Sequence, residues 1–131
     1  MTPLTESDHT LISLAQDVIA RNYDDLSGRH TVGAAVRCKD GKVYLGVNLY
    51  SIHGSCAEFV AIGAAIAAGE REFETIVSVR GGEKPEILSP CGNCRQMLLN
   101  YAPECSVIVV TNQGPAKVLA KELLPFAYMQ P

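Results

Sequence analysis

The sequence predicts an α/β fold in which one sheet is packed between helical layers. Segments with apolar residues at helical spacing alternate along the chain with short β-branched segments, and this alternation is typical of that class. The chain has 131 residues, 47% of them hydrophobic, which is enough to bury the core of one domain. No repeat, linker or low-complexity segment divides it, so we expect a single domain over residues 1–131.

The first half of the chain predicts a helix followed by a β-hairpin. Thr5 can cap the helix, with Asp8 three residues later as in a capping box. Apolar residues then recur at helical spacing at Leu11, Leu14, Ala15, Val18 and Ile19. Two apolar runs, 31–38 and 42–49, follow and predict strands. The pair Asp40-Gly41 between them suits a tight turn.

The second half predicts two helices, and each of them opens at a cysteine. The composition is helical over residues 56–69 and 92–101, and Gly69 is a natural end for the first. Cys56 is therefore expected in a first helical turn, where the helix dipole favours a thiolate. Further strands are predicted at 75–80, 106–111 and, as a short last strand, 116–119.

Three thiols and one carboxylate form the candidate catalytic site. Cys91 and Cys94 have the spacing that lets two sulfurs bind one metal ion, and Cys56 can supply a third ligand. Three thiolates leave the fourth tetrahedral position of zinc open for water, as in a catalytic and not a structural site. Glu58, two residues after Cys56, is then close enough to transfer the protons of that water. The pattern predicts a zinc-dependent hydrolase.

Several of the neighbouring residues have alternative interpretations. A closed structural zinc site would use His53 or Cys105 as fourth ligand, but it would leave Glu58 without a function. If the zinc site is open, His53 is expected to be a loop residue that faces the pocket and does not bind the metal. Cys38 and Cys105 lie in strand-like runs, where small buried side chains are expected. Arg95 can donate to the thiolates from behind the metal or can form a surface ion pair.

Charge and hydropathy argue against polynucleotide and membrane partners. The net charge is -3, and the eleven basic residues are scattered, whereas a phosphate-binding surface needs a cluster. The amino terminus lacks the basic start of a signal peptide, and the apolar stretch 59–68 is too short to cross a bilayer. Five cysteines, an odd number, favour metal or thiol chemistry over a disulfide framework. We therefore expect a cytoplasmic location and a small-molecule substrate.

These motifs resemble the small cytidine deaminase family, including the blasticidin S deaminases, over nearly the whole chain. The two metal motifs are specific, and the others mainly fix the alignment. The matching segments are Cys56-Ala57-Glu58, Ser89-Pro90-Cys91-Gly92-Asn93-Cys94-Arg95-Gln96, Val32-Gly33-Ala34-Ala35-Val36, Asp40-Gly41-Lys42-Val43-Tyr44, Gly46-Val47-Asn48 and Glu122-Leu123-Leu124-Pro125. The resemblance implies a three-layer α/β/α fold with a mixed five-stranded sheet and one zinc ion per subunit. It also implies a homotetramer whose active sites are completed by neighbouring subunits.

The residues expected to contact the substrate differ from those of most cytidine deaminases. Such enzymes usually have Asn-x-Glu at the end of the second strand, with both side chains on the ribose. This chain has Asn48-Leu49-Tyr50 there, as blasticidin S deaminases do. His30 stands where an aromatic ring usually meets the pyrimidine, and Tyr128 stands where phenylalanine is common. The resemblance implies substrate contacts from Asn48, Tyr50, His30, Ala57, Ser89 and Tyr128.

The resemblance implies that Glu58 helps to replace the 4-amino group of a small cytosine nucleoside by a carbonyl, with release of ammonia. Tyr50 favours a blasticidin S-like or otherwise modified nucleoside, and the alternative is cytidine or deoxycytidine in pyrimidine salvage. A further alternative is a non-catalytic, zinc-stabilised nucleoside-binding module, which would not need Glu58. Phe59 and Asn93 stand where relatives often supply an arginine to the thiolates, so the charge of the metal site must be balanced in another way.

Overall fold

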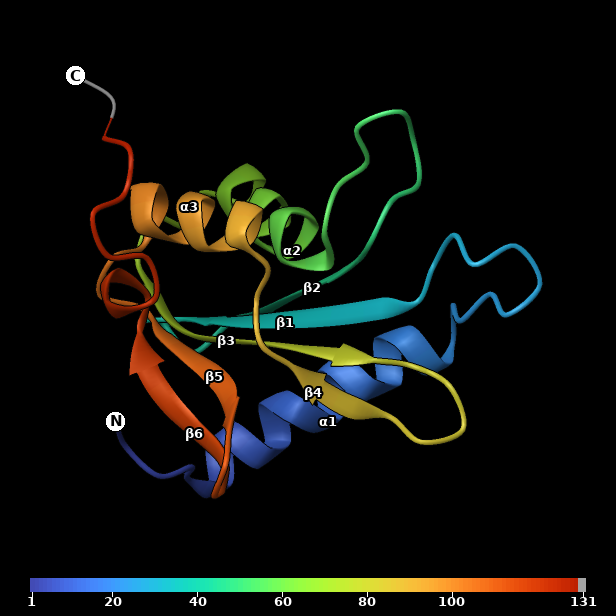
Figure 1. The fold of residues 1–131 in the computed structure, drawn as a ribbon, viewed down its shortest axis with the longest axis horizontal. Coiled ribbons are helices and arrows are strands. Elements are labelled where there is room, and N and C mark those ends of the chain that lie inside the picture. The colour runs from blue at the N-terminus through green and yellow to red at the C-terminus, as the bar shows by residue number, and fades with distance from the viewer. Residues whose placement is uncertain (130–131) are drawn as a thin grey trace.

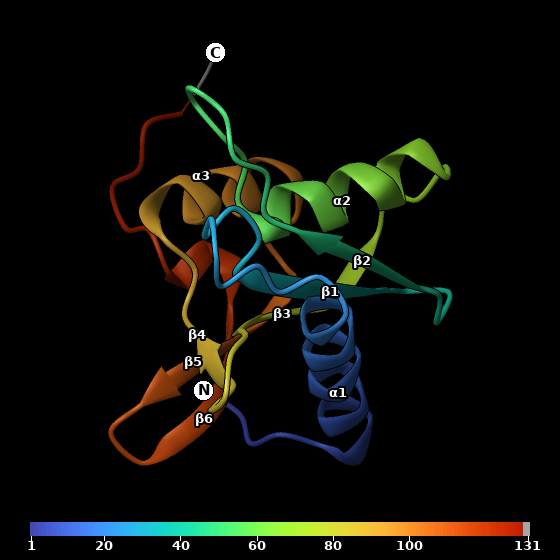
Figure 2. The same cartoon turned by 90° about the vertical axis from the view of Figure 1, so that its right-hand side faces the viewer.

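A mixed β-sheet lies between helices in the computed structural model, which describes residues 1–129 (Figure 1). Helix α1 covers one face of the sheet, and helices α2 and α3 cover the other (Figures 1 and 2). The elements in chain order are α1 (Glu6–Ala20), β1 (Val32–Cys38), β2 (Val43–Val47), α2 (Ala57–Ala67), β3 (Phe73–Arg80), β4 (Glu86–Leu88), α3 (Gly92–Tyr101), β5 (Ser106–Thr111), β6 (Gly114–Leu119) and the short 3-10 helix η1 (Ala120–Glu122). The predicted α/β class is confirmed.

The sheet has the order β2-β1-β3-β5-β6, and β4 pairs with β3 beside this path. Strands β3 and β5 run parallel but share only the pairs Thr75–Ser106 and Ile76–Val107. Beyond that point the same side of β3 pairs antiparallel with β4, where Ser78 lies opposite Leu88. The expected five strands are present, and β4 adds a sixth that the sequence did not predict. With three residues, β4 is too short for a periodic pattern.

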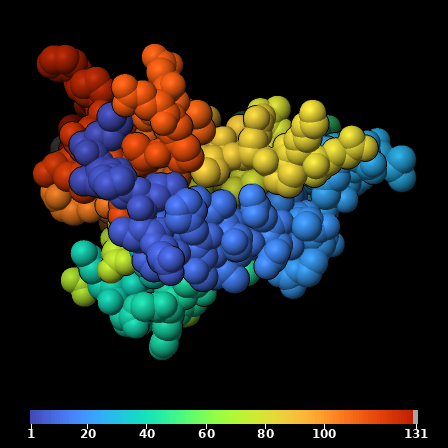
Figure 3. Space-filling model, turned by 90° about the horizontal axis from the view of Figure 1, so that it is seen from below, coloured from blue at the N-terminus to red at the C-terminus, as the bar shows by residue number. Residues whose placement is uncertain are grey.

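Helix α1 begins with the predicted capping box. The Thr5 hydroxyl accepts from the Asp8 N–H at 3.3 Å, and the Asp8 carboxylate accepts from the Thr5 N–H at 2.8 Å. The fully buried Asp8 also forms ion pairs with Arg37 on β1 and Lys117 on β6, at 3.1 and 2.8 Å. The helix start is therefore tied to both strands. Figure 3 shows α1 in blue, lying across this face of the molecule beside the orange segment that contains β6.

The opposite face of the sheet holds the larger core, in which β2 lies close against the first turns of α2. A Cβ added at Gly46 on β2 would lie only 2.5 Å from the backbone nitrogen of Ala61 and 2.8 Å from the carbonyl oxygen of Ala57. The lack of a side chain at Gly46 thus allows β2 to touch the backbone of α2. Cys38 and Cys105 are both buried in this core, so the prediction that they are small buried side chains is confirmed. No helix within residues 1–129 has the length and apolar character needed to cross a membrane.

Candidate metal centre and active site

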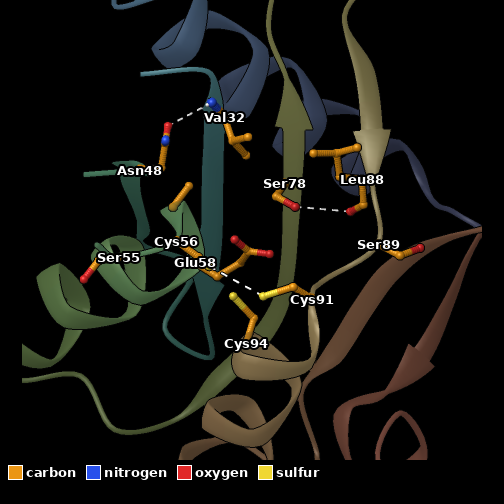
Figure 4. A pocket seen from close by; sticks show the side chains of 11 residues that line it. Val32, Asn48, Ser55, Cys56, Glu58, Ser78, Leu88, Ser89, Cys91 and Cys94 are labelled. Carbon is orange, nitrogen blue, oxygen red and sulfur yellow. Dashed lines mark hydrogen bonds between the residues drawn. The ribbon is translucent and has the colours of Figure 1, made fainter. Parts of the chain in front are cut away.

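Three cysteine sulfurs converge where the first turns of α2 and α3 meet (Figure 4). The Sγ atoms of Cys56, Cys91 and Cys94 all lie within 4.8 Å of one another, and those of Cys56 and Cys91 are 3.6 Å apart. Zinc–sulfur bonds of about 2.3 Å at tetrahedral angles place two sulfurs about 3.8 Å apart. The separation of Cys56 and Cys91 therefore fits one zinc ion, and Cys94 lies close enough to join them as a third ligand.

A closed site with a fourth protein ligand does not form in the described part of the chain. Neither His53 nor Cys105 belongs to the group of potential metal ligands. His53 is exposed in the loop after β2, and Cys105 is buried beside β5. The arrangement thus has three sulfur ligands and room for one further ligand, which is the donor set of a catalytic zinc site.

Two of the thiols lie at helix N-termini, and backbone N–H groups favour the thiolate at the start of α3. Cys56 is the N-cap of α2, one position before the first turn in which it was predicted, and Cys91 is the N-cap of α3. Burial raises the pKa of the Cys56 and Cys94 thiols. Burial also acts to raise the pKa of Cys91, but hydrogen bonds from the Cys94 and Asn93 N–H groups and from the neighbouring thiols outweigh it and lower this pKa. A cation between the sulfurs would favour the deprotonated form of all three.

Glu58 is buried beside the sulfurs, in the first turn of α2. It lines a cavity of about 280 Å³ together with Cys56, Cys91 and Cys94 (Figure 4). Burial raises the pKa of the Glu58 carboxyl, and its own N–H, the Ser78 hydroxyl and the Cys94 thiol offset part of this rise. A carboxyl group placed beside a metal-bound water can take a proton from it and return that proton to a substrate.

The comparisons with known proteins agree with this geometry. Residues 5–111 match the model of the cytidine and deoxycytidylate deaminase zinc-binding region. The chain belongs to this deaminase family. Its members act as zinc-dependent hydrolytic deaminases, so the chain is an enzyme of that type.

Two curated relatives and one solved structure illustrate the similarity. Blasticidin-S deaminase from Bacillus cereus is 36% identical over 134 residues, covering 95% of this chain and 94% of that protein. Cytidine deaminase from Halalkalibacterium halodurans is 35% identical over 105 residues, covering 76% of this chain and 78% of that protein. The crystal structure of cytidine deaminase from Burkholderia pseudomallei has a TM-score of 0.73 at 33% identity, covering 95% of this chain and all of that one.

Half of the substrate contacts predicted for this deaminase line the cavity. Asn48, Ala57 and Ser89 contribute to its wall. His30 lies behind Asn48, with its Nδ1 atom 2.8 Å from the Asn48 carbonyl oxygen. Tyr50 is 70% exposed, and the Arg29 guanidinium lies over its ring at 5.3 Å from the centroid. Tyr128, in the C-terminal segment, is also exposed. The roles of all six residues in substrate binding stay predictions.

Tyr128 is connected to α3 through its backbone. Its carbonyl oxygen accepts a hydrogen bond from the Gln96 Nε2 atom at 3.1 Å.

Arg95 also connects α3 to the C-terminal segment. Its Nε atom donates to the Pro90 carbonyl oxygen at 2.8 Å, and its Nη1 atom donates to the Leu123 carbonyl oxygen at 3.2 Å. The described residues show no hydrogen bond from Arg95 to a sulfur, and its predicted donation to the thiolates stays a prediction. Arg95 instead connects the residue before Cys91 to the C-terminal segment.

The side-chain amide of Asn48 is almost fully used within the protein. Its Oδ1 atom accepts from the N–H groups of Thr31 and Val32 at 2.9 and 3.0 Å, and its Nδ2 atom donates to the Arg29 carbonyl at 3.1 Å. The two N–H donors identify the oxygen end of the amide, so its orientation is fixed. Only one N–H of Asn48 is left to donate to a ligand in the cavity.

Sequence reasoning missed four residues of the cavity wall, one of which, Ser55, directly precedes Cys56. Val32 and Leu88 are apolar strand residues and carry no chemical signal of a site. Ser78 does carry one, because it places a hydroxyl in an otherwise apolar part of β3. That hydroxyl lies in the wall next to Glu58 (Figure 4).

Proposed function

We propose that the protein is a zinc-dependent aminohydrolase that converts the 4-amino group of a small cytosine nucleoside into a carbonyl and releases ammonia. The observation that carries the proposal is the buried Glu58 beside three clustered cysteine sulfurs in one cavity. Cys56, Cys91 and Cys94 would hold the zinc ion. Bound zinc would supply the Lewis acidity that makes water a nucleophile near neutral pH.

Glu58 performs the proton transfers in this scheme. Its carboxylate takes a proton from the water that attacks C4 of the ring, and passes a proton to the ring nitrogen. It then helps the amine to leave as ammonia. Water and the cytosine ring thus give a uracil ring and ammonia, with no other reactant. The position of Glu58 next to the metal ligands, and outside their group, supports this role.

Within this class, we favour a blasticidin S-like or otherwise modified cytosine nucleoside as substrate. The similarity to the Bacillus cereus blasticidin-S deaminase extends over 95% of the chain, compared with 76% for the Halalkalibacterium halodurans cytidine deaminase. Tyr50, where cytidine deaminases usually have glutamate, supports the same choice. The alternative is cytidine or deoxycytidine, which the similarity to the Burkholderia pseudomallei cytidine deaminase supports.

A homotetramer belongs to the same proposal. The exposed residues of α2 are all small, at Gly63, Ala64 and Ala67, and Ala68 follows at the C-cap. A Cβ at Gly63 would meet nothing within 4 Å. The loop after β2 and the C-terminal segment project from the same side of the sheet (Figures 1 and 2) and expose Leu49, Tyr50, Ile52, Phe126 and Tyr128. A second copy packed on this side would cover these apolar side chains.

We also place the protein in the cytoplasm. All five cysteines are free thiols, and three of them form the candidate metal site. A reducing compartment keeps such thiols available as metal ligands.

Turnover monitored by ultraviolet absorbance tests the function. We expect zinc-loaded protein to deaminate at least one of cytidine, deoxycytidine, cytosine and blasticidin S when these are assayed in parallel. Metal analysis of the same sample should give one zinc ion per chain. A protein that binds a nucleoside and never changes its absorbance would instead be the non-catalytic nucleoside-binding module.

A further inference from the structure

Ser78 is a buried hydroxyl in the cavity wall that the proposed mechanism does not use. Four polar or charged side chains are recorded as buried among the described residues: Asp8, Glu58, Thr75 and Ser78. Asp8 and Thr75 both accept hydrogen bonds from Arg37 on the α1 face of the sheet. Glu58 and Ser78 both line the cavity on the other face. Ser78 is only 3% exposed, so its hydroxyl depends on partners within the protein.

The strand explains why the hydroxyl points at the site. Successive side chains of β3 alternate between the two faces of the sheet: Ile76 belongs to the core under α2 and α3, whereas Val77 and Val79 belong to the core under α1. Ser78 therefore faces α2, as Ile76 does. It also lies where β3 changes its partner from β5 to β4.

The hydroxyl has two neighbours that compete for its single hydrogen. Ser78 Oγ lies 3.2 Å from the carbonyl oxygen of Leu88, which can only accept, so the hydrogen points there in this structure. On the other side is the Glu58 carboxylate (Figure 4). A serine hydroxyl has one hydrogen and two lone pairs, and it can rotate to suit its partners. It can therefore donate to a Glu58 carboxylate or accept from a protonated Glu58 carboxyl.

Ser78 is the polar side chain beside Glu58 on the β3 side of the site. The two residues also line a second, smaller cavity, and every other residue of its wall is apolar: Ile76, Val77, Leu88, Pro90, Leu98, Val107 and Ile108. A buried carboxylate that lacks a donor is costly and poorly oriented.

We propose that Ser78 is a positioning residue for Glu58. Its hydroxyl donates to the Glu58 carboxylate before the carboxylate takes a proton. It then turns to the Leu88 carbonyl and accepts from the protonated Glu58. Ser78 loses no proton and forms no covalent bond in this cycle. The inference rests on the proposed role of Glu58 as the proton carrier.

The test compares Ser78→Ala, Ser78→Thr and Ser78→Val in the full-length, zinc-loaded protein. We expect Ser78→Ala to lower kcat about tenfold, with KM within about twofold of native and unchanged zinc content, because a misplaced proton carrier slows only the chemical step. Ser78→Thr should stay within about threefold of the native kcat, and Ser78→Val should lose as much as Ser78→Ala. The solvent deuterium isotope effect on kcat should rise in the Ala and Val variants.

The Thr and Val variants have nearly the same shape and differ in the hydroxyl, so they decide the question even if Ser78→Ala fails to fold. Equal kcat values for these two variants would overturn the inference, as would a loss explained by missing zinc or by KM alone. Thr75→Val is the matched control, since it removes a buried hydroxyl of β3 on the α1 face and should keep the native kcat. If Glu58→Gln is inactive while Ser78→Ala keeps full activity, only the inference about Ser78 is refuted. An active Glu58→Gln refutes the proposed mechanism itself.

Discussion

At the residue scale, the proposed chemistry requires Glu58 to lie beside the metal ligands and not among them. Glu58→Gln should keep the fold and the zinc, because its side chain is not one of the three clustered ligands. It should lose turnover by about two to four orders of magnitude, which is the usual contribution of a general acid–base group. Metal analysis and turnover assays on one purified sample measure both properties.

The matched comparison uses the cysteines. Cys91→Ala or Cys94→Ala should lose the zinc and the activity together, since each removes a metal ligand. If zinc is lost from Glu58→Gln as well, Glu58 is a ligand and the mechanism is wrong.

Tyr50 gives a prediction about substrate choice. A glutamate there would accept charge-assisted hydrogen bonds from ribose hydroxyls, which are stronger than those of a neutral tyrosine by about 1–3 kcal/mol. The Arg29 guanidinium, now over the Tyr50 ring, would also pair with a carboxylate. We therefore expect Tyr50→Glu to raise kcat/KM for cytidine relative to blasticidin S by about tenfold. Tyr50→Phe is the control, because it keeps the ring beside Arg29. Native protein that deaminates cytidine efficiently and ignores blasticidin S would contradict this interpretation.

Asn48 should matter for every nucleoside, whatever its sugar. Asn48→Asp can still accept from the N–H groups of Thr31 and Val32, but it has no N–H for the Arg29 carbonyl or for a ligand. We expect kcat/KM to fall about tenfold or more for all substrates, and Asn48→Ala to lose at least as much. Assays with cytidine and blasticidin S in parallel check this. A loss confined to one of them would show that Asn48 contacts a substituent peculiar to that substrate.

At the element scale, the buried charge at the start of α1 makes stability depend on pH. Burial acts to raise the pKa of Asp8, but hydrogen bonds from Lys117, Thr5 and Arg37 outweigh it and lower the pKa from 3.8 to about 2. A carboxyl whose pKa is lower in the folded protein stabilises it above pH 3.8, and this contribution disappears as the pH falls through about 2. The shift corresponds to about 2 kcal/mol at neutral pH.

Urea unfolding of native protein and Asp8→Asn at several pH values measures this contribution. The difference in free energy of unfolding between native protein and Asp8→Asn should be largest near pH 7 and should shrink between pH 4 and pH 2. Asp17→Asn alters an exposed carboxylate of the same helix and is the control. An advantage for native protein that is the same at every pH would show that packing, not charge, makes Asp8 important.

Local signals predicted most elements, and non-local contacts explain those that were missed. The Thr5–Asp8 box and the apolar spacing are contained in α1 itself, so its start could be predicted. Strand β4 has three residues and exists because β3 offers it a partner beyond the point where β5 leaves. The same change of partner brings Leu88 opposite Ser78. The hydroxyl in an apolar strand distinguishes Ser78 in the sequence, but its position at the site depends on contacts outside β3.

At the scale of the whole molecule, the metal site depends on two helices that β3 and β4 separate in the sequence. The pair Cys91 and Cys94 could be predicted from spacing within one turn. The approach of Cys56, which is 35 residues before Cys91, requires α2 and α3 to begin side by side on one face of the sheet. Only the resemblance to a family could indicate that approach. The family resemblance did not predict that Tyr50 and Tyr128 are exposed in a single chain, because their surroundings depend on more than one chain in the proposed assembly.

The proposed homotetramer gives the last prediction. The loop after β2 and the C-terminal segment leave Tyr50, Ile52 and Phe126 exposed, and Ile52 and Phe126 have almost no contact with the rest of the chain. Exposed apolar side chains beside a small-residue helix face are typical of an interface with another copy. Light scattering at micromolar concentration should therefore give four times the mass of one chain.

Ala64→Arg tests whether this interface lies on α2. Ala64 is exposed on the small-residue face, where an arginine would hold a second helix away. We expect the variant to have a lower mass by light scattering and a reduced kcat/KM, with an unchanged zinc content. Ala20→Arg, on the exposed end of α1 in the opposite layer, should keep the native mass and activity. A native protein that is monomeric at micromolar concentration and fully active would refute the assembly, because each cavity would then be complete within one chain.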